Sequence, residues 1–419
     1  MALNYIWVGF IIIGIVVGIL KVVFLGQSGL LSEMLTALFD AAKNGFEISI
    51  GLTGIMSLWL GIMKIGERAG VISLFSRAVA PLFSILFKGL PKNSPAYGNV
   101  MMNLSANMLG LDNAATPLGL KAMNDLQEIN PNKETASDAQ IMFLVLNTAG
   151  ITLIPTSVIA IRQTIALEQH IPNFNAADIF LPTLIATFIA FISGIIIVSI
   201  YQRINIFKLP VLLFIGGFCC LIGLLQYYLM RLPADQINKT IGAIGSGVIL
   251  SIILLFIIAG LIKKHNVYEH FIEGAKEGFT VATKIIPYLV AMLLAISIFR
   301  SSGCLDYILA AIAKVVSLCG LNTDFVPALP VALMKPLSGS GARGLMVDIM
   351  RNPQYGVASF QGKLAAIIQG STETTFYVLA VYFGSVQIKN TRHALVCGLI
   401  ADFMGLLGAI VVGYLFFHK

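Results

Sequence analysis

Long apolar runs recur from one end of the chain to the other, and they constrain its fold more than any other feature. Each run is about 20 residues long, the length that an α-helix needs to cross the hydrocarbon core of a bilayer. The chain is 57% hydrophobic and only 11% charged, whereas soluble domains carry about 25% charged residues. We therefore predict an all-α, polytopic membrane protein without a soluble domain of useful size.

The basic residues behind the net charge of +7 are spread along the connectors between apolar runs. This spread is typical of the positive-inside pattern of membrane proteins. No concentrated basic patch with interleaved aromatic residues occurs, so a nucleic-acid partner is not expected. The lipid bilayer is the expected surrounding instead, and the opening run MALNYIWVGFIIIGIVVGILKVVF is interpreted as a retained membrane helix.

The pattern predicts membrane spans joined by polar connectors. The predicted spans are residues 5–25, 46–64, 139–161 and 393–417, together with three plainer helices at 178–200, 210–230 and 243–262. The predicted connectors are 27–44, 124–138, 162–177, 201–208 and 263–277. Residues 66–91 are apolar but carry Arg68, Arg77 and Lys88, so they are expected to lie at the interface or to re-enter the membrane.

Polar side chains interrupt the apolar sequence of residues 95–123. Gly110, Pro117 and Gly119 disturb any regular helix there. An ordinary loop is one interpretation, but the stretch is rich in Met, Leu and Ala. A helical hairpin or a broken helix is therefore favoured. Its polar side chains are Asn103, Asn107, Asp112, Asn113 and Thr116.

Two further membrane segments contain a polar break. Residues 147–155 combine Asn147, Thr148 and Thr152 with Pro155, which removes a backbone donor. The second break opens the stretch QGSTETTFYVLAVYF, residues 369–383, and has Glu373 at its centre. Polar groups at membrane depth must be satisfied by protein, water or substrate. Both breaks are therefore candidate functional sites.

The second half of the chain repeats the first. Residues 42–46 read AKNGF and residues 275–279 read AKEGF, and the same shift of 233 takes Ala69-Gly70 to Ser302-Gly303. The two polar breaks pair as well, with Asn147 opposite Gln369. We divide the chain into a first half, 1–177, linking helices, 178–262, and a second half, 263–419. The pattern leaves open whether the repeats are parallel or inverted.

Paired repeats with discontinuous helices are characteristic of secondary transporters, which bind substrate where the half-helices end. We therefore expect a substrate site between the repeats. The first half offers amides and hydroxyls: Asn103, Asn107, Asn113, Thr116, Asn147, Thr148 and Thr152. The second half adds charges: Lys335, Ser338, Ser340, Arg343, Gln369, Ser371, Thr372, Glu373 and Thr374.

The charged residues allow two interpretations. An ion pair between Glu373 and Lys335 or Arg343 would offset the desolvation cost of each and hold the fold. Alternatively, these charges contact a polar or anionic substrate, or a carboxylate titrates in proton coupling. The candidates for proton or ion coupling are Glu373, Asp402 and Asp112.

Motifs of enzymes and ATPases are missing from the sequence. No GxxxxGK[ST], HExxH or GxSxG occurs, and no nucleophile–base spacing stands out. The five histidines lie in connectors or at chain ends. Neither an enzymatic activity nor a cofactor or metal site is expected.

Several long motifs resemble known families. AKNGFE, GIMSLWLGIMKIGERAG, NLSANMLGLDNAATPLGLKAM and NTAGITLIPTSVIAIR resemble spore maturation protein A. FIEGAKEGF, FRSSG, KPLSGSGA and QGSTETTFYVLAVYFGSV resemble spore maturation protein B. The chain looks like a fusion of the two, and the resemblance covers nearly all of it except the helices around 178–262. Both families contain a nucleoside-recognition or Gate domain, which is similar to parts of concentrative nucleoside transporters and of the ferrous-iron transporter.

The resemblance implies two Gate-like repeats in a multi-pass protein of a bacterial inner or plasma membrane. Our first hypothesis is a transporter or facilitator of a polar solute. The alternative is a membrane scaffold or assembly factor in cell-envelope or spore maturation. The solute, the coupling ion and the oligomeric state, a homo-oligomer included, stay open.

Overall fold

The computed structural model describes residues 2–91, 94–110, 112–232 and 234–418, and helices dominate this part of the chain. Within these residues, the β-structure is limited to one isolated bridge between Thr135 and Asn390. Eight of the described helical segments are long and apolar enough to cross a membrane, the interrupted segment Phe360–Ser385 among them. The prediction of an all-α, multi-pass membrane protein is confirmed.

The first half begins with two long helices, continues with five shorter ones and ends with another long helix. They are α1 (Ala2–Leu25), α2 (Leu30–Arg68), α3 (Val71–Leu86), α4 (Pro95–Met108), α5 (Asp112–Glu128), α6 (Asp138–Thr148), α7 (Thr156–Glu168), the 3₁₀ turn η1 (Ala176–Ile179) and α8 (Phe180–Gln202). Residues 95–123 thus form a helical hairpin, α4–α5. Residues 139–161 form a broken helix, α6–α7.

Two helices connect the first half to the second half, which repeats the order of the first. The linking helices are α9 (Leu209–Met230) and α10 (Ala234–Ile262). The second half contains α11 (Val267–Ser301), α12 (Cys304–Leu318), η2 (Val326–Ala328), α13 (Leu329–Met334), α14 (Gly339–Arg351), α15 (Phe360–Ser371), α16 (Thr375–Ser385) and α17 (Ala394–Phe417).

The correspondence between the halves extends to backbone conformation. Gly70 precedes α3 with φ 77°, and Gly303, 233 residues later, precedes α12 with φ 81°. This left-handed conformation is open to glycine at little cost. In both halves it turns the chain sharply from a long helix into a short one. The duplication is therefore present in the backbone as well as in the sequence motifs.

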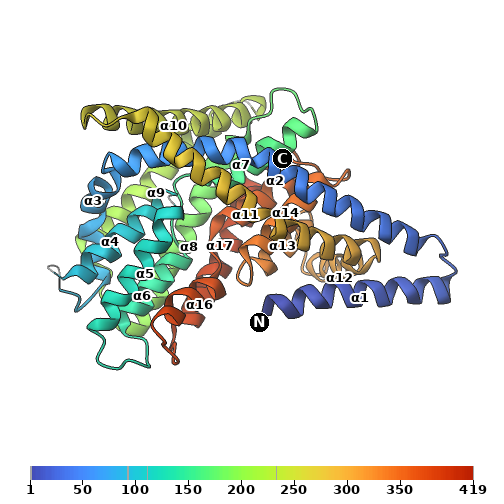
Figure 1. Cartoon of the computed structure of the whole chain (residues 1–419), viewed down its shortest axis with the longest axis horizontal. Coiled ribbons are helices and arrows are strands. Elements are labelled where there is room, and N and C mark those ends of the chain that lie inside the picture. Colours follow the sequence, from blue (N-terminus) through green and yellow to red (C-terminus); the bar gives the residue numbers. More distant parts are fainter. Residues whose placement is uncertain (1, 92–93, 111, 233, 419) are drawn as a thin grey trace.

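The long helices α2 and α11 show that the two repeats are inverted. Ser297 of α11 donates a hydrogen bond to the carbonyl of Ala37 near the start of α2, at 2.9 Å. At the other end of α2, Lys64 lies 2.9 Å from Glu277, near the start of α11. Residue numbers rise along one helix as they fall along the other, so these two corresponding helices are antiparallel (Figure 1).

The helices α8 and α17 are related in the same way. Gly194 of α8 lies against Ala401 of α17, and Gly408 of α17 lies against Ile189. The pairing again runs in opposite directions. The repeat thus extends through α8 and α17, and the question of parallel or inverted repeats is answered in favour of inversion.

The broken helices are also antiparallel. The start of α6 meets the loop before α17, where Arg392 pairs with Asp138 at 2.7 Å. The start of α15 meets the loop before α8, where Lys363 pairs with Asp178 at 2.9 Å. Each broken helix therefore begins where the other ends, and their breaks come together at mid-length.

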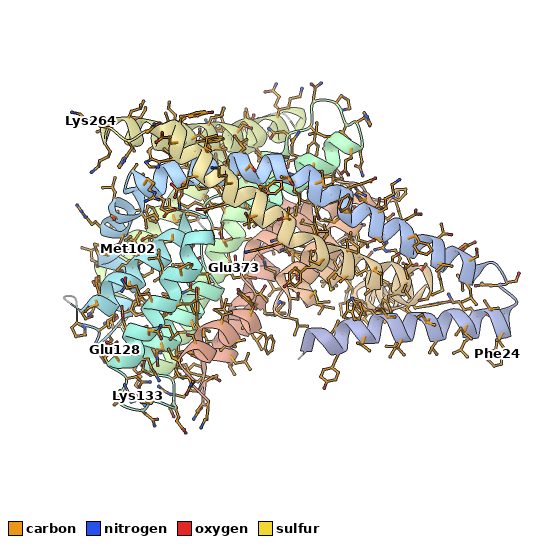
Figure 2. All side chains as sticks on the ribbon, in the orientation of Figure 1. Phe24, Met102, Glu128, Lys133, Lys264 and Glu373 are labelled. Atoms are coloured by element: carbon orange, nitrogen blue, oxygen red, sulfur yellow. The ribbon has the colours of Figure 1, made fainter. Side chains whose placement is uncertain are left out.

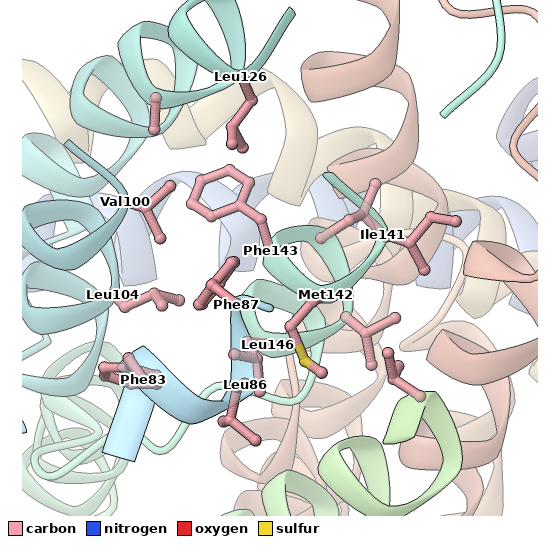
Figure 3. Close-up of a cluster of buried hydrophobic side chains, with 14 of the residues drawn as sticks. Phe83, Leu86, Phe87, Val100, Leu104, Leu126, Ile141, Met142, Phe143 and Leu146 are labelled. Atoms are coloured by element: carbon pink, nitrogen blue, oxygen red, sulfur yellow. The ribbon is translucent and has the colours of Figure 1, made fainter. Parts of the chain in front are cut away.

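The helix α6 is the centre of the largest hydrophobic cluster. Met142 and Phe143 of this helix are fully buried. They pack among side chains of α3, α4 and α5, including Phe83 and Leu104 (Figure 3). In contrast, the turn between α1 and α2 protrudes from the other helices at one edge of the molecule (Figure 1).

Three expected connectors are helical over seven residues or more. Residues 27–44 are mostly the first turns of α2, residues 162–168 complete α7, and α11 begins at Val267. The physical reason is visible in α2, where Met34, Ala41, Gly45 and Ile48 are buried at helical spacing. Polar residues on the other face made this segment look like a solvent connector.

Candidate functional site

Two breaks in helices meet at the interface of the halves. The first lies between the end of α6 at Thr148 and the start of α7 at Thr156, and the second between Ser371 and Thr375. The backbone N–H of Glu373 donates to the carbonyl of Thr148 at 2.8 Å. One broken helix thus supplies the missing donor at the end of the other, as a backbone without water requires.

The hairpin of each half closes over its own break. The N–H of Leu153, in the first break, donates to the carbonyl of Met108 at the tip of the α4–α5 hairpin, at 2.8 Å. In the second half, the N–H of Phe376 donates to the carbonyl of Pro336 at the tip between α13 and α14, at 3.0 Å. In both halves, therefore, a backbone N–H at or next to the break finds its hydrogen-bond acceptor at the tip of the hairpin.

Amide side chains at equivalent positions strengthen both closures. Asn147 accepts a hydrogen bond from the Asn107 amide at 2.5 Å, which joins α6 to the hairpin tip of the first half. Gln369, its counterpart, donates to the carbonyl of Gly339 at 3.3 Å, which joins α15 to the start of α14. The sequence pairing of Asn147 with Gln369 thus corresponds to a shared structural role.

A polar cavity of about 240 Å³ lies where the breaks and the hairpins meet. Glu373 lies on its wall near the centre of the molecule (Figure 2). Nine residues predicted from the sequence line it together, from both halves: Asn107, Thr116, Asn147, Thr152, Lys335, Arg343, Gln369, Thr372 and Glu373. The cavity is of the size and polarity that suits a small polar ligand.

Among the described residues of the cavity wall, two side chains are basic and one is acidic. Lys335 and Arg343 face Glu373, and the first residues of α7 and α14, Thr156 and Gly339, also line the cavity. Helix N-termini attract negative charge because their N–H groups are unpaired within the helix. Glu373 shares the cavity with Lys335 and Arg343, and an ion pair among them stays a prediction. The arrangement can hold a polar solute that carries a negative group.

Other predicted residues support the site from behind and do not line the cavity. Asn103 donates to the carbonyl of Ala115 at 2.7 Å and joins α4 to α5. Ser338 caps α14 by accepting from the N–H of Gly341. Thr148, Ser340, Ser371 and Thr374 belong to the same breaks and turns. The side chains of Asp112 and Asn113 lie outside the described part of the structure.

Several cavity residues were not predicted from the sequence. Tyr377, Val378, Val381 and Tyr382 form one face of α16 and line the cavity. Their spacing of one, three and one residues places them on one side of a helix, and this spacing was the available signal. It was missed because tyrosine and valine in an apolar segment are usually interpreted as core.

Charged residues near the ends of the broken helices were also missed. Arg162 is fully buried and pairs with Asp178 at 2.5 Å, and Asp178 also binds Lys363. Among the residues that were searched for metal ligands, all of them in the described part of the chain, no group of three or more His, Cys, Asp or Glu side chains could hold an ion.

Fold and cavity together define a multi-pass membrane protein with two inverted repeats, each built of a helical hairpin and a broken helix. The chain belongs to the nucleoside-recognition, or Gate, family, whose model matches residues 49–164 and 282–389. These two regions begin 233 residues apart, in agreement with the internal duplication. No solved structure matches the chain.

Two relatives from Bacillus subtilis divide the chain between them. It is 43% identical to spore maturation protein A over 194 residues, which cover 46% of the chain and 92% of the relative. It is 47% identical to spore maturation protein B over 170 residues, which cover 41% of the chain and 91% of the relative. The chain thus joins an A-like and a B-like part in one polypeptide. Inner membrane protein YjiG of Escherichia coli is 33% identical over 87 residues, covering 20% of the chain and 55% of that protein.

Proposed function

We propose that this protein is a secondary transporter or facilitator of a small polar solute, which binds in the cavity between the two halves. The observation that carries the proposal is the meeting of both breaks at one polar cavity. Membrane helices are interrupted at a cost, because backbone groups lose their partners in a medium without water. Two interruptions that face one polar cavity favour a binding site over a purely structural role.

Inversion of the repeats supports the same proposal. In an inverted pair, one arrangement of the halves opens the shared site to one side of the membrane, and the exchanged arrangement opens it to the other. In the described residues, each hairpin contacts its break through a backbone hydrogen bond, at Leu153 or Phe376, and through the amide of Asn147 or Gln369. A hairpin can exchange these hydrogen bonds for water and leave its break without unfolding a helix.

Placement in a bacterial inner membrane is part of the proposal, supported by the printed name of the Escherichia coli relative. Chemical conversion of the solute is not part of the proposal. A scaffold role in maturation, which the names of the Bacillus subtilis relatives suggest, becomes one outcome of the following test.

The test begins with a thermal-shift screen of the purified protein against nucleosides, amino acids, nucleotides and organic acids. A ligand that binds the folded state raises the melting temperature, by an amount that grows with its concentration relative to Kd. Compounds that bind are then tested for uptake into vesicles that contain the protein.

Glu373→Gln is the variant that connects uptake with the cavity. It should bind and transport the solute poorly while melting at the normal temperature without ligand. Glu33→Gln is the matched control, because Glu33 is exposed in the first turn of α2. If no compound binds, or if Glu373→Gln transports normally, the proposed site is wrong and a scaffold role is favoured.

A further inference from the structure

Asp402 is a buried carboxylate that the solute cavity does not use. It is the only charged residue in α17 and is 7% exposed. Its Oδ2 accepts a hydrogen bond from the Thr375 hydroxyl at 2.5 Å, whereas its buried Oδ1 accepts none from any described residue. An ionised carboxylate with an unpartnered oxygen at membrane depth is costly. The site therefore requires a proton or a counter-charge.

A second cavity, of about 220 Å³, contains this carboxylate. Ser371, Thr372 and Lys335 line it with Asp402. Lys335 and Thr372 also line the solute cavity. These two residues are thus the shared wall between the cavities, with Glu373 on the solute side and Asp402 on the other.

The second cavity has an apolar outer rim. Leu333 and Phe403 line it and are 65% and 57% exposed on the outside of the helices, where a membrane protein meets lipid. Lipid offers no water to accept a proton. The route from Asp402 to water therefore passes the shared wall and enters the solute cavity.

We propose that Asp402 is a proton-exchange site coupled to the solute cavity through Lys335. This inference rests on the proposed transport function and names its coupling ion. In one state, Asp402 is a carboxylic acid and Lys335 serves an anionic group of the solute. In the other state, the O–H bond of Asp402 has broken, its proton has passed to water in the solute cavity, and the Lys335 ammonium balances the carboxylate.

Reciprocal coupling follows from the shared lysine. A solute anion that attracts Lys335 removes the counter-charge of Asp402 and thereby favours its protonation. By thermodynamic linkage, protonation of Asp402 strengthens binding of the anion by the same factor. The protein would then move one proton with each anionic solute. The hydrogen bond from Thr375 connects the same event to the first turn of α16, directly after Glu373.

The charged groups around Asp402 fit a proton better than a resident metal cation. Lys335 lines the same cavity as Asp402, and Glu373 lies on the solute side of the shared wall. Helix α8, which packs against α17, has no charged residue between Phe180 and Gln202. In α6 and α15, the only charges are Asp138 and Lys363 near the helix starts, where they pair with Arg392 and Asp178. An ammonium on the cavity wall disfavours a second cation beside it.

Infrared difference spectroscopy tests the proton site without a known solute. The purified protein is reconstituted in phosphatidylcholine vesicles, and spectra are compared across a pH series. We expect the carbonyl stretch of a buried carboxylic acid at acid pH and its loss on alkalinisation. The band should be absent in Asp402→Asn, restored in Asp402→Glu and unchanged in Glu33→Gln.

Lys335→Met keeps the test decisive even if Asp402→Asn does not fold. With the ammonium removed, the acid should persist to a pH about 1 unit higher or more, as expected for the loss of a close opposite charge. The proposal would be overturned if the unaltered protein lacked the Asp402 band. It would also be overturned if the band disappeared at the same pH in Lys335→Met as in the unaltered protein.

Transport measurements separate this inference from the proposed function. With a solute found in the screen, uptake by the unaltered protein should be at least tenfold faster with a pH gradient across the vesicle membrane than without one. Uptake by Asp402→Asn should not respond to the gradient. Proton-driven uptake that persists in Asp402→Asn refutes the coupling role alone. If no solute is transported while the Asp402 band still titrates, the proposed transport function fails and the proton site stands.

Discussion

The two broken helices perform the same structural task with different chemistry. The first break, from Ala149 to Pro155, is long and neutral, whereas the second, from Thr372 to Thr374, is short and contains Glu373. Both are closed by an amide on the helix before the break, Asn147 or Gln369. The comparison teaches that backbone geometry has been kept in both halves while the charges have gathered in one.

The ion pairs at the ends of the broken helices show a second contrast. On one side, Arg162, Asp178 and Lys363 form a group with little exposure. On the other side, the equivalent contact is the Arg392–Asp138 pair, whose side chains are 38% and 52% exposed. The contacts join the halves in related positions, but only the first excludes water. They should therefore differ in energy.

The largest effect is expected from Arg162→Met. The buried Arg162 guanidinium donates hydrogen bonds to Asp178 and to the carbonyl of Ala176, and hydrogen bonds to charged groups contribute about 1.5–3 kcal/mol each. The free energy of unfolding should therefore fall by about 3 kcal/mol or more, although Asp178 keeps Lys363 as its partner. Unfolding in a denaturing detergent, followed through the fluorescence of Trp7 and Trp59, measures the loss.

Arg392→Met is the matched variant on the exposed side. Pairs in water contribute about 0–1 kcal/mol, so stability should change little. Equal losses in both variants would show that the contrast between the two sides is wrong.

Glu373→Gln is the next largest perturbation and addresses the contrast between the breaks. Hydrogen bonds to charged groups contribute about 1.5–3 kcal/mol, which corresponds to a loss of roughly 10- to 150-fold in kcat/KM for solute uptake. Uptake into vesicles at several solute concentrations gives this ratio. Unchanged uptake would show that the break containing Glu373 does not contribute to solute binding.

Asn147→Ala should have a smaller effect on the same measurement. A neutral hydrogen bond contributes about 1 kcal/mol, so kcat/KM should fall about fivefold. A loss as large as that of Glu373→Gln would mean that the neutral half carries as much binding energy as the charged half.

The smallest expected effect depends on pH and lies at the end of the second half. The ring of His418 at 2.6 Å lowers the pKa of Asp324 below its ordinary value. A carboxyl group with a lowered pKa stabilises the fold at every pH above the ordinary pKa of about 3.9. This stabilisation disappears as the pH falls through the lowered pKa.

Asp324→Asn tests this contribution by thermal unfolding. The pair is partly exposed and screened by water, so the melting temperature should fall only slightly at pH 7. The two proteins should melt alike well below pH 3. A difference that grows in acid would have the wrong sign.

Much of the architecture was predictable, because hydrophobic runs, helix breakers and a repeated motif are local signals. The hairpin at residues 95–123 and the breaks at Asn147 and Glu373 follow from polar residues in apolar surroundings. Inversion was not predictable, because the motifs that reveal a duplication carry no information on direction. Contacts such as Ser297 with Ala37 decide it.

The cavity was predictable in its polar part only. Asparagine, threonine and glutamate at membrane depth need partners, so their presence predicts a site. In the sequence, Tyr377 and Tyr382 look like core residues of an apolar helix. Only the packing of α16 places them on the cavity wall. Arg162 began a segment that resembled a solvent connector, and Asp178 began a predicted helix. Their burial was not visible in the sequence, since burial of a charge depends on a partner far away in the chain.

The interlocking of the halves has a consequence for how the protein is supplied to the membrane. Both halves contribute to the wall of the solute cavity, so one half without the other has no complete solute site. Two separate polypeptides would need matched synthesis and an encounter within the bilayer. The connection through residues 263–266, between α10 and α11, delivers the halves in equal number and at a high effective concentration. Assembly of the site then does not depend on how much protein a cell makes.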